Sequence, residues 1–88
     1  MNNKSARRDT LTILSDLLQN MREPKRITNL LYASNLSYTQ LVKYLKMIQD
    51  MELAVKKSKP FVSFSITTEG EFFVETIQKR QEPKILVK

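Results

Sequence analysis

The apolar positions of this chain follow a helical period at first and the two-residue period of strands after residue 51. The clearest helical stretch is Ser37 to Met51, whose apolar side chains recur every three or four residues at Leu41, Tyr44, Leu45 and Ile48. This spacing places them on one stripe of a helix that faces a core. Ser37 and Gln40 have the spacing of a capping box, which marks where the helix begins.

Two further amphipathic helices are predicted before this one. Asp9 or Thr10 opens the first, which runs to about Met21 with its apolar stripe at Leu11, Leu14, Leu17, Leu18 and Met21. The second runs from about Lys25 to Ala33, because Pro24 suits the first position of a helix, and its buried side is Ile27, Leu30 and Leu31. Only residues 34 to 36 separate it from Ser37, and Asn35 tolerates a left-handed backbone. This is the spacing of a helix-turn-helix.

A β-hairpin is predicted after residue 51. Leu53 and Val55 are expected on one face of its first strand. Residues 61 to 66 alternate strictly in the second strand, with the inward positions at Val62, Phe64 and Ile66. The tip between the strands is basic and carries Lys56, Lys57, Lys59 and Pro60. Since an isolated hairpin is not stable in water, its apolar face must pack on the helices.

The last predicted element is a helix that Pro83 ends. Thr68 and Glu71 have the spacing of a second capping box, and the apolar side consists of Phe72, Phe73 and Ile77. The predicted order is three helices, two strands and a helix, which is an α+β winged helix-turn-helix domain over residues 9–82. Residues 1–8 are predicted to be a flexible basic arm, and residues 83–88 a C-terminal tail.

The distribution of charge along the chain indicates which class of partner the domain binds. Fifteen Lys and Arg against nine Asp and Glu give a net charge of +6. Residues 22–59 carry eight basic and three acidic side chains, a net charge of +5, whereas residues 61–82 carry two basic and four acidic ones, a net charge of −2. The positive charge therefore surrounds the helix-turn-helix and the hairpin tip, which favours a polyanionic partner.

Several residue types are missing from the sequence. The chain has no cysteine, no histidine and a single glycine, so it lacks thiolate ligands, the usual general base and a glycine-rich phosphate loop. These absences predict a binding protein and not an enzyme, with no metal and no cofactor. No apolar run approaches the roughly 20 residues of a membrane span, and no signal peptide is evident, which predicts a cytoplasmic protein.

The segment KRITNLLYASNLSYTQLVKYLK, residues 25–46, resembles the small archaeal winged-helix regulators and chromatin-type proteins of about ten kilodaltons. The matching positions are Tyr32, Asn35 to Tyr38, Tyr44 and Leu45. The closing pattern I-T-x-x-G-x-x-F of that family is matched by Ile66, Thr67, Gly70 and Phe73. Members usually have a glycine between the third helix and the first strand, where this chain has residues 50–53.

The resemblance implies a DNA-binding winged helix that is usually a homodimer through the last helix, here through Phe72, Phe73 and Ile77. For double-stranded DNA, the residues predicted to read bases in the major groove are Tyr38, Thr39, Gln40 and Lys43. The residues predicted to contact the phosphate backbone are Lys25, Arg26, Lys46, Lys56, Lys57 and Lys59. The favoured function is a cytoplasmic, nucleoid-associated transcriptional regulator.

Two other functions stay open at this point. One is a non-specific, chromatin-type protein that coats DNA. The other is a winged helix that binds another protein, which Val42 and Met47 on the outer part of the third helix would support. An RNA-binding domain is a weaker alternative, because the strands lack the paired exposed aromatics that stack on bases. The sequence does not specify a target site.

Overall fold

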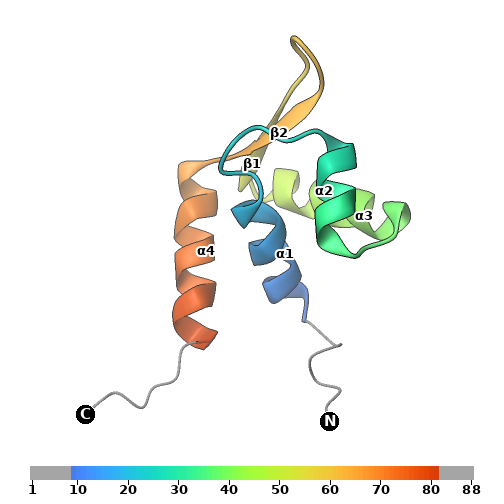
Figure 1. The fold of residues 1–88 in the computed structure, drawn as a ribbon. Helices are drawn as coiled ribbons and strands as arrows, with labels where there is room; N and C mark the ends of the chain where they lie inside the picture. The colour runs from blue at the N-terminus through green and yellow to red at the C-terminus, as the bar shows by residue number, and fades with distance from the viewer. Residues whose placement is uncertain (1–8, 82–88) are drawn as a thin grey trace, which may run out of the picture.

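A computed structural model describes residues 9–81, and its elements occur in the predicted order (Figure 1). They are α1 (Thr10–Gln19), α2 (Ile27–Ser34), α3 (Tyr38–Asp50), β1 (Ala54–Lys57), β2 (Ser63–Ile66) and α4 (Thr68–Gln81). Figure 1 shows α1 beside α4, with α2 and α3 across α1 from α4 and the hairpin projecting away from the helices. The predicted arm at residues 1–8 and tail at residues 83–88 lie outside the described residues.

One apolar core joins the helices to the inner face of the hairpin. Its buried members include Leu14, Leu17, Leu18, Leu30, Leu41, Leu45, Ile48, Phe64 and Val74. Fully burying one such side chain stabilises the fold by about 1.5–3 kcal/mol before the entropy of ordering is counted. The predicted stripe of the third helix is therefore confirmed, and Tyr44 packs against the core from a half-buried position.

The beginnings of α1 and α3 agree with the predicted caps. Asp9 accepts a hydrogen bond from the Thr12 backbone N–H at 2.9 Å, and this bond holds the pKa of the Asp9 carboxyl below its ordinary value. At α3, Ser37 Oγ accepts from the Gln40 backbone N–H at 3.1 Å, while Gln40 Oε1 accepts from the Ser37 backbone N–H at 3.1 Å. Both bonds of the capping box are present.

Two helix boundaries differ from the prediction. α1 ends at Gln19, so the buried Met21 lies beyond it, where the Met21 carbonyl accepts from the Ile66 backbone N–H at 3.0 Å. α2 begins at Ile27, because Lys25 is extended and pairs with Phe64 through two backbone hydrogen bonds of 3.0 and 2.9 Å. Pro24 therefore precedes a short bridge to the hairpin and does not open the helix.

The cap of α4 is Thr67, so the predicted capping box of Thr68 and Glu71 is wrong. Thr67 Oγ1 accepts from the Gly70 backbone N–H at 3.0 Å and donates to the Glu52 carbonyl at 2.8 Å. The Thr67 backbone N–H also donates to the Leu53 carbonyl at 3.0 Å. Thr67 and not Thr68 therefore caps α4, because its hydrogen bonds also connect the start of α4 to the segment that follows α3.

The hairpin register corrects part of the predicted strand pattern. β1 and β2 are antiparallel, and Ala54 pairs with Ile66, Val55 with Ser65, Lys56 with Phe64 and Lys57 with Ser63. Phe64 is buried and Ile66 half-buried, as predicted. Val55 is instead 45% exposed, because it opposes Ser65 on the outer face, and Val62 is 46% exposed, because it precedes β2. Leu53 is buried just before β1.

Glu52, between α3 and β1, has a left-handed backbone with φ of 61°. Its backbone N–H donates to the Gln49 carbonyl at 2.9 Å, and its carbonyl accepts from Thr67, so the conformation is held from both sides. A residue with a Cβ atom is strained in this conformation, whereas glycine is not. The left-handed backbone therefore explains why the proteins that this chain resembles usually have a glycine between the third helix and the first strand.

We expect Glu52→Gly to raise the free energy of unfolding by about 0.5–1 kcal/mol, because relief of strain exceeds the entropy that glycine adds to the unfolded chain. Urea denaturation followed by circular dichroism measures the change. Glu52→Ala is the control, since it removes the carboxylate but keeps the strained Cβ. An equal gain in both variants would assign the effect to charge and contradict the backbone explanation.

Candidate nucleic-acid interface

The N-terminal half of α3 presents the four predicted base-reading residues to solvent. The buried Leu41, Leu45 and Ile48 fix the orientation of the helix. All four predicted residues are exposed, namely Tyr38, Thr39, Gln40 and Lys43. Val42, which is 42% exposed, belongs to the same surface. The structure therefore places these residues on the solvent-exposed part of one helix, with Tyr38 and Gln40 on opposite flanks of it, since neighbouring residues are about 100° apart around a helix.

The capping box changes what Gln40 can do. Bidentate pairing of glutamine with adenine uses both the carbonyl oxygen and the amide nitrogen. Gln40 Oε1 already accepts from the Ser37 backbone N–H, which turns the amide toward the start of the helix. The other base-reading candidates are not engaged in this cap, and the Lys43 Nζ atom lies 5.1 Å from the centre of the Tyr44 ring.

The predicted backbone-contact residues differ in their pairing. Lys46 forms an exposed ion pair of 3.5 Å with Asp50, and such a pair is weak and easily screened. Within residues 9–81, no ion pair engages the other five, which are Lys25, Arg26, Lys56, Lys57 and Lys59. Their charges are therefore available to an anionic partner.

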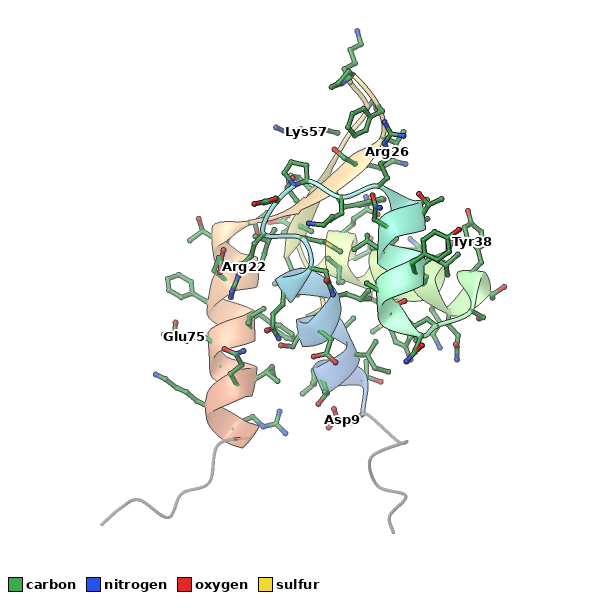
Figure 2. The ribbon with its side chains drawn as sticks, viewed as in Figure 1. Asp9, Arg22, Arg26, Tyr38, Lys57 and Glu75 are labelled. Carbon is green, nitrogen blue, oxygen red and sulfur yellow. The ribbon has the colours of Figure 1, made fainter. Side chains whose placement is uncertain are left out.

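The wing, defined as residues 54–66, carries lysines on both of its faces. Neighbouring residues of a strand point to opposite faces, so Lys56 shares the face of its partner Phe64, and Lys57 lies on the other face. Figure 2 shows the Lys57 side chain leaving the wing on the side away from Arg26. The three tip lysines, including Lys59, thus do not form a single row.

Arg26 and Phe61 form a contact that the sequence analysis missed. The Arg26 guanidinium carbon lies 4.0 Å from the centre of the Phe61 ring, in cation–π contact, and Phe61 is 42% exposed. The predicted alternation of residues 61–66 put Phe61 on the outward side next to a basic tip. That position was the available signal for an exposed aromatic ring with a cationic neighbour.

The three residues predicted to form a dimer contact do not share a surface on α4. Phe72 is 64% exposed, Phe73 is half-buried against the core, and Ile77 is only 4% exposed. Ile77 is buried within the single chain, because α4 packs along α1. Of the three, Phe72 is the side chain that projects into solvent.

The helix α3, the short turn before it and the basic wing define a winged helix-turn-helix domain. The sequence model of the family described as "Winged helix-turn-helix" matches residues 7–84. This chain therefore belongs to the winged helix-turn-helix family. No curated protein matches it by sequence.

Solved structures with the same fold come from archaea and bacteria. Sso10a-2, a DNA-binding protein from Sulfolobus solfataricus, matches with a TM-score of 0.77 and 24% identity, over 83% of this chain and 78% of that one. The transcriptional regulator Tm0710 from Thermotoga maritima matches with a TM-score of 0.67 and 20% identity, over 77% of this chain and 51% of that one.

A third similar structure is that of BpsR from Bordetella bronchiseptica, whose DNA binding is regulated by 6-hydroxynicotinic acid. It matches with a TM-score of 0.69 and 12% identity, over 85% of this chain and 55% of that one. The chain spans about half the length of each bacterial structure. Among residues 9–81, none of the helices combines the length and apolar character that crossing a membrane requires.

Proposed function

We propose that this winged helix binds double-stranded DNA, with the N-terminal half of α3 in the major groove and the wing on the phosphate backbone. The observation that carries the proposal is that a set of basic side chains without an ion pair among residues 9–81 belongs to the chain before α2, to α3 and to the wing, namely Lys25, Arg26, Lys43, Lys56, Lys57 and Lys59, whereas Glu69, Glu71 and Glu75 belong to α4. Figure 2 places Arg26 and Tyr38 on the side of α2 and α3 and Glu75 of α4 on the opposite side. A surface with this polarity attracts and orients a polyanion.

The exposed end of α3 suggests a role for each base-reading candidate. Lys43 can donate to guanine or to a phosphate, and Thr39 can contact a thymine methyl or a phosphate. Tyr38 lies at the first position of the helix, where its hydroxyl can donate to the backbone. Gln40 can pair with adenine only after its capping bond to Ser37 opens. We assign the main specificity to Lys43.

We also propose that two copies associate through α4. The exposed Phe72 lies on a helix with Glu69 and Glu71 in its first turn and Lys79 and Arg80 in its last turn. Antiparallel pairing of two such helices would set acidic ends against basic ends. Sedimentation at micromolar concentrations tests this, and a monomer throughout that range would refute it.

The physiological role that we propose is transcriptional regulation in the cytoplasm. A protein-binding winged helix is the second candidate, because Val42 leaves apolar surface on α3 beside Tyr38. Fluorescence anisotropy separates the candidates when a random duplex and the protein's own upstream DNA are titrated across a salt series. A steep salt slope with preference for the upstream duplex supports a regulator, and a steep slope without preference supports a coating role. Absence of binding at low salt favours the protein-binding alternative.

Lys43→Ala is expected to weaken binding to the preferred duplex by roughly tenfold or more, since one specific base contact discriminates by about 1–3 kcal/mol. Binding to a random duplex should lose at most one phosphate contact. Lys79→Ala on α4 is the matched control, because it removes the same charge far from the proposed DNA interface; since Lys79 lies in the proposed α4 pairing, sedimentation must first show that this variant associates as the parent does. Equal losses on both duplexes would move Lys43 from base reading to backbone contact.

A further inference from the structure

The wing is fastened to the chain at the start of α2 at two points, one in β2 and one in the loop that joins β1 to β2. The backbone bridge between Lys25 and Phe64 joins the chain just before α2 to β2. The second point is the stack of Arg26 on Phe61, at 4.0 Å. Arg26 directly follows Lys25, and Phe61 precedes Phe64 by three positions. The bridge between Lys25 and Phe64 therefore brings the side chains of Arg26 and Phe61 close together.

The stack leaves the hydrogen-bonding edge of Arg26 free. A guanidinium is planar and carries its five N–H donors in the plane, so contact through one face does not block them. Arg26 is exposed and forms no ion pair with any other residue of the described segment. Phe61 keeps 42% of its surface exposed even with Arg26 over its ring, so the contact lies at the protein surface, where a duplex can reach Arg26.

We infer that Phe61 is a positioning residue that holds the Arg26 guanidinium as a preorganised phosphate clamp between α2 and the wing. The inference rests on the proposed DNA binding. Its ligand is a backbone phosphate of the duplex, which an arginine can grip with two parallel hydrogen bonds. A free arginine loses much of its side-chain entropy when it binds, whereas an arginine already stacked on a ring loses less.

This role differs from that of the tip lysines. Lys56, Lys57 and Lys59 have no aromatic partner among the described residues and act as mobile point charges. The clamp instead fixes one phosphate relative to both α2 and the wing. The position of α3 in the groove then follows from that anchor, since the short turn after α2 connects the two helices rigidly.

The test is a double-mutant cycle in duplex-binding anisotropy on the full chain. Phe61→Leu keeps an apolar side chain but removes the aromatic face, and we expect binding to a random duplex about fivefold weaker. The salt slope should stay unchanged, because Arg26 keeps its charge. Arg26→Ala should lower the slope by about one. In the Arg26→Ala background, Phe61→Leu should have no further effect.

Two more variants separate the effect of the aromatic ring from that of the planar guanidinium. Phe61→Tyr keeps the ring and should bind like the parent. Arg26→Lys keeps the charge and leaves every residue of the wing in place but lacks the planar fork, so it should weaken binding as Phe61→Leu does, again with the parent's salt slope. Arg26→Lys therefore tests whether the planar guanidinium matters for DNA binding even if Phe61→Leu perturbs the wing.

Three results would overturn the inference. Parental affinity for both Phe61→Leu and Arg26→Lys would show that the stack does not matter. An undiminished loss from Phe61→Leu in the Arg26→Ala background would show that Phe61 acts on DNA directly, as an apolar wedge would. A parent protein that binds no duplex at low salt would refute the clamp together with the proposed function, whereas the first two results leave DNA binding intact.

Discussion

Replacing Gly70 by alanine is expected to lower the free energy of unfolding by about 2–3 kcal/mol, a loss typical of an overpacked site. Gly70 is buried in the first turn of α4, beneath the segment that follows α3. A Cβ atom there would overlap the Leu53 carbonyl oxygen and lie 2.6 Å from Ile66 Cγ1. The Leu53 carbonyl cannot move easily, because it accepts from the Thr67 backbone N–H.

Two effects of opposite sign compete in this substitution. Glycine is about 1 kcal/mol less favourable than alanine inside a helix, so propensity alone predicts that Gly70→Ala stabilises. The backbone overlap predicts a larger loss, and the sign of the measured change decides between them. A net loss of this size corresponds to a fall in melting temperature of roughly 10–20 °C for a domain of this length.

Thermal and urea unfolding of Gly70→Ala measure the change. The control is Thr76→Ala, an exposed position on the same helix that gains alanine's propensity without meeting any neighbour. It should be neutral or slightly stabilising. A Gly70→Ala protein as stable as the parent would mean that α4 can shift away from the Leu53 segment, contrary to the close packing described.

Removing the three wing lysines together is expected to have the largest effect on DNA binding. In Lys56→Ala/Lys57→Ala/Lys59→Ala, the slope of log affinity against log salt should fall by roughly two to three, since each phosphate contact contributes about 0.9 and Lys56 and Lys57 lie on opposite faces of the wing. The loss should be similar for random and preferred duplexes, because phosphates carry no sequence information. Anisotropy titrations across the salt series measure both quantities.

The matched control removes charge from the far end of α4, where Lys79 and Arg80 lie in the last turn. Lys79→Ala/Arg80→Ala lowers the net charge by two and should leave the slope close to the parent's, provided that sedimentation shows the same association state as the parent. A slope that falls by a similar amount per charge in both variants would show that net charge attracts the DNA without a wing contact. A triple variant with the parent's slope would show that the wing does not contact the duplex.

Sequence reasoning succeeded wherever a local rule determines the structure. The helical period identified the buried stripe of α3, and the side chains of Ser37 and Gln40 sufficed to locate its start. Asn35 takes the predicted left-handed conformation, with φ of 60°. These features depend on residues within a few positions of one another, so the local sequence is sufficient to predict them.

The errors come from contacts between distant segments. Lys25 fits a helix start by local rules, but β2 pairs with it and holds it extended. Thr67 and Thr68 are both plausible caps, and the Glu52 carbonyl decides in favour of Thr67. Val55 and Val62 were assigned inward because the strands were expected to begin earlier than they do.

The candidate interface was predicted as a set of residues but not as an arrangement. The exposure of Tyr38, Thr39 and Lys43 follows from the buried stripe of α3 and could be predicted. The stack of Arg26 on Phe61 could not, because it requires the register between the chain before α2 and β2. The division of Lys56 and Lys57 between two faces likewise depends on where β1 begins.

The Thr67 hydroxyl, which bonds both Glu52 and Gly70, joins the segment that follows α3 to the first turn of α4, and this joint helps to set how the two helices are oriented. If α4 holds two copies together, this joint also contributes to how far apart their two α3 helices stand. That distance must match about one helical turn of DNA, or a multiple of it, for both helices to enter major grooves on one side of the duplex. The spacing between the half-sites of an operator would then depend in part on a threonine that touches neither DNA nor the second copy.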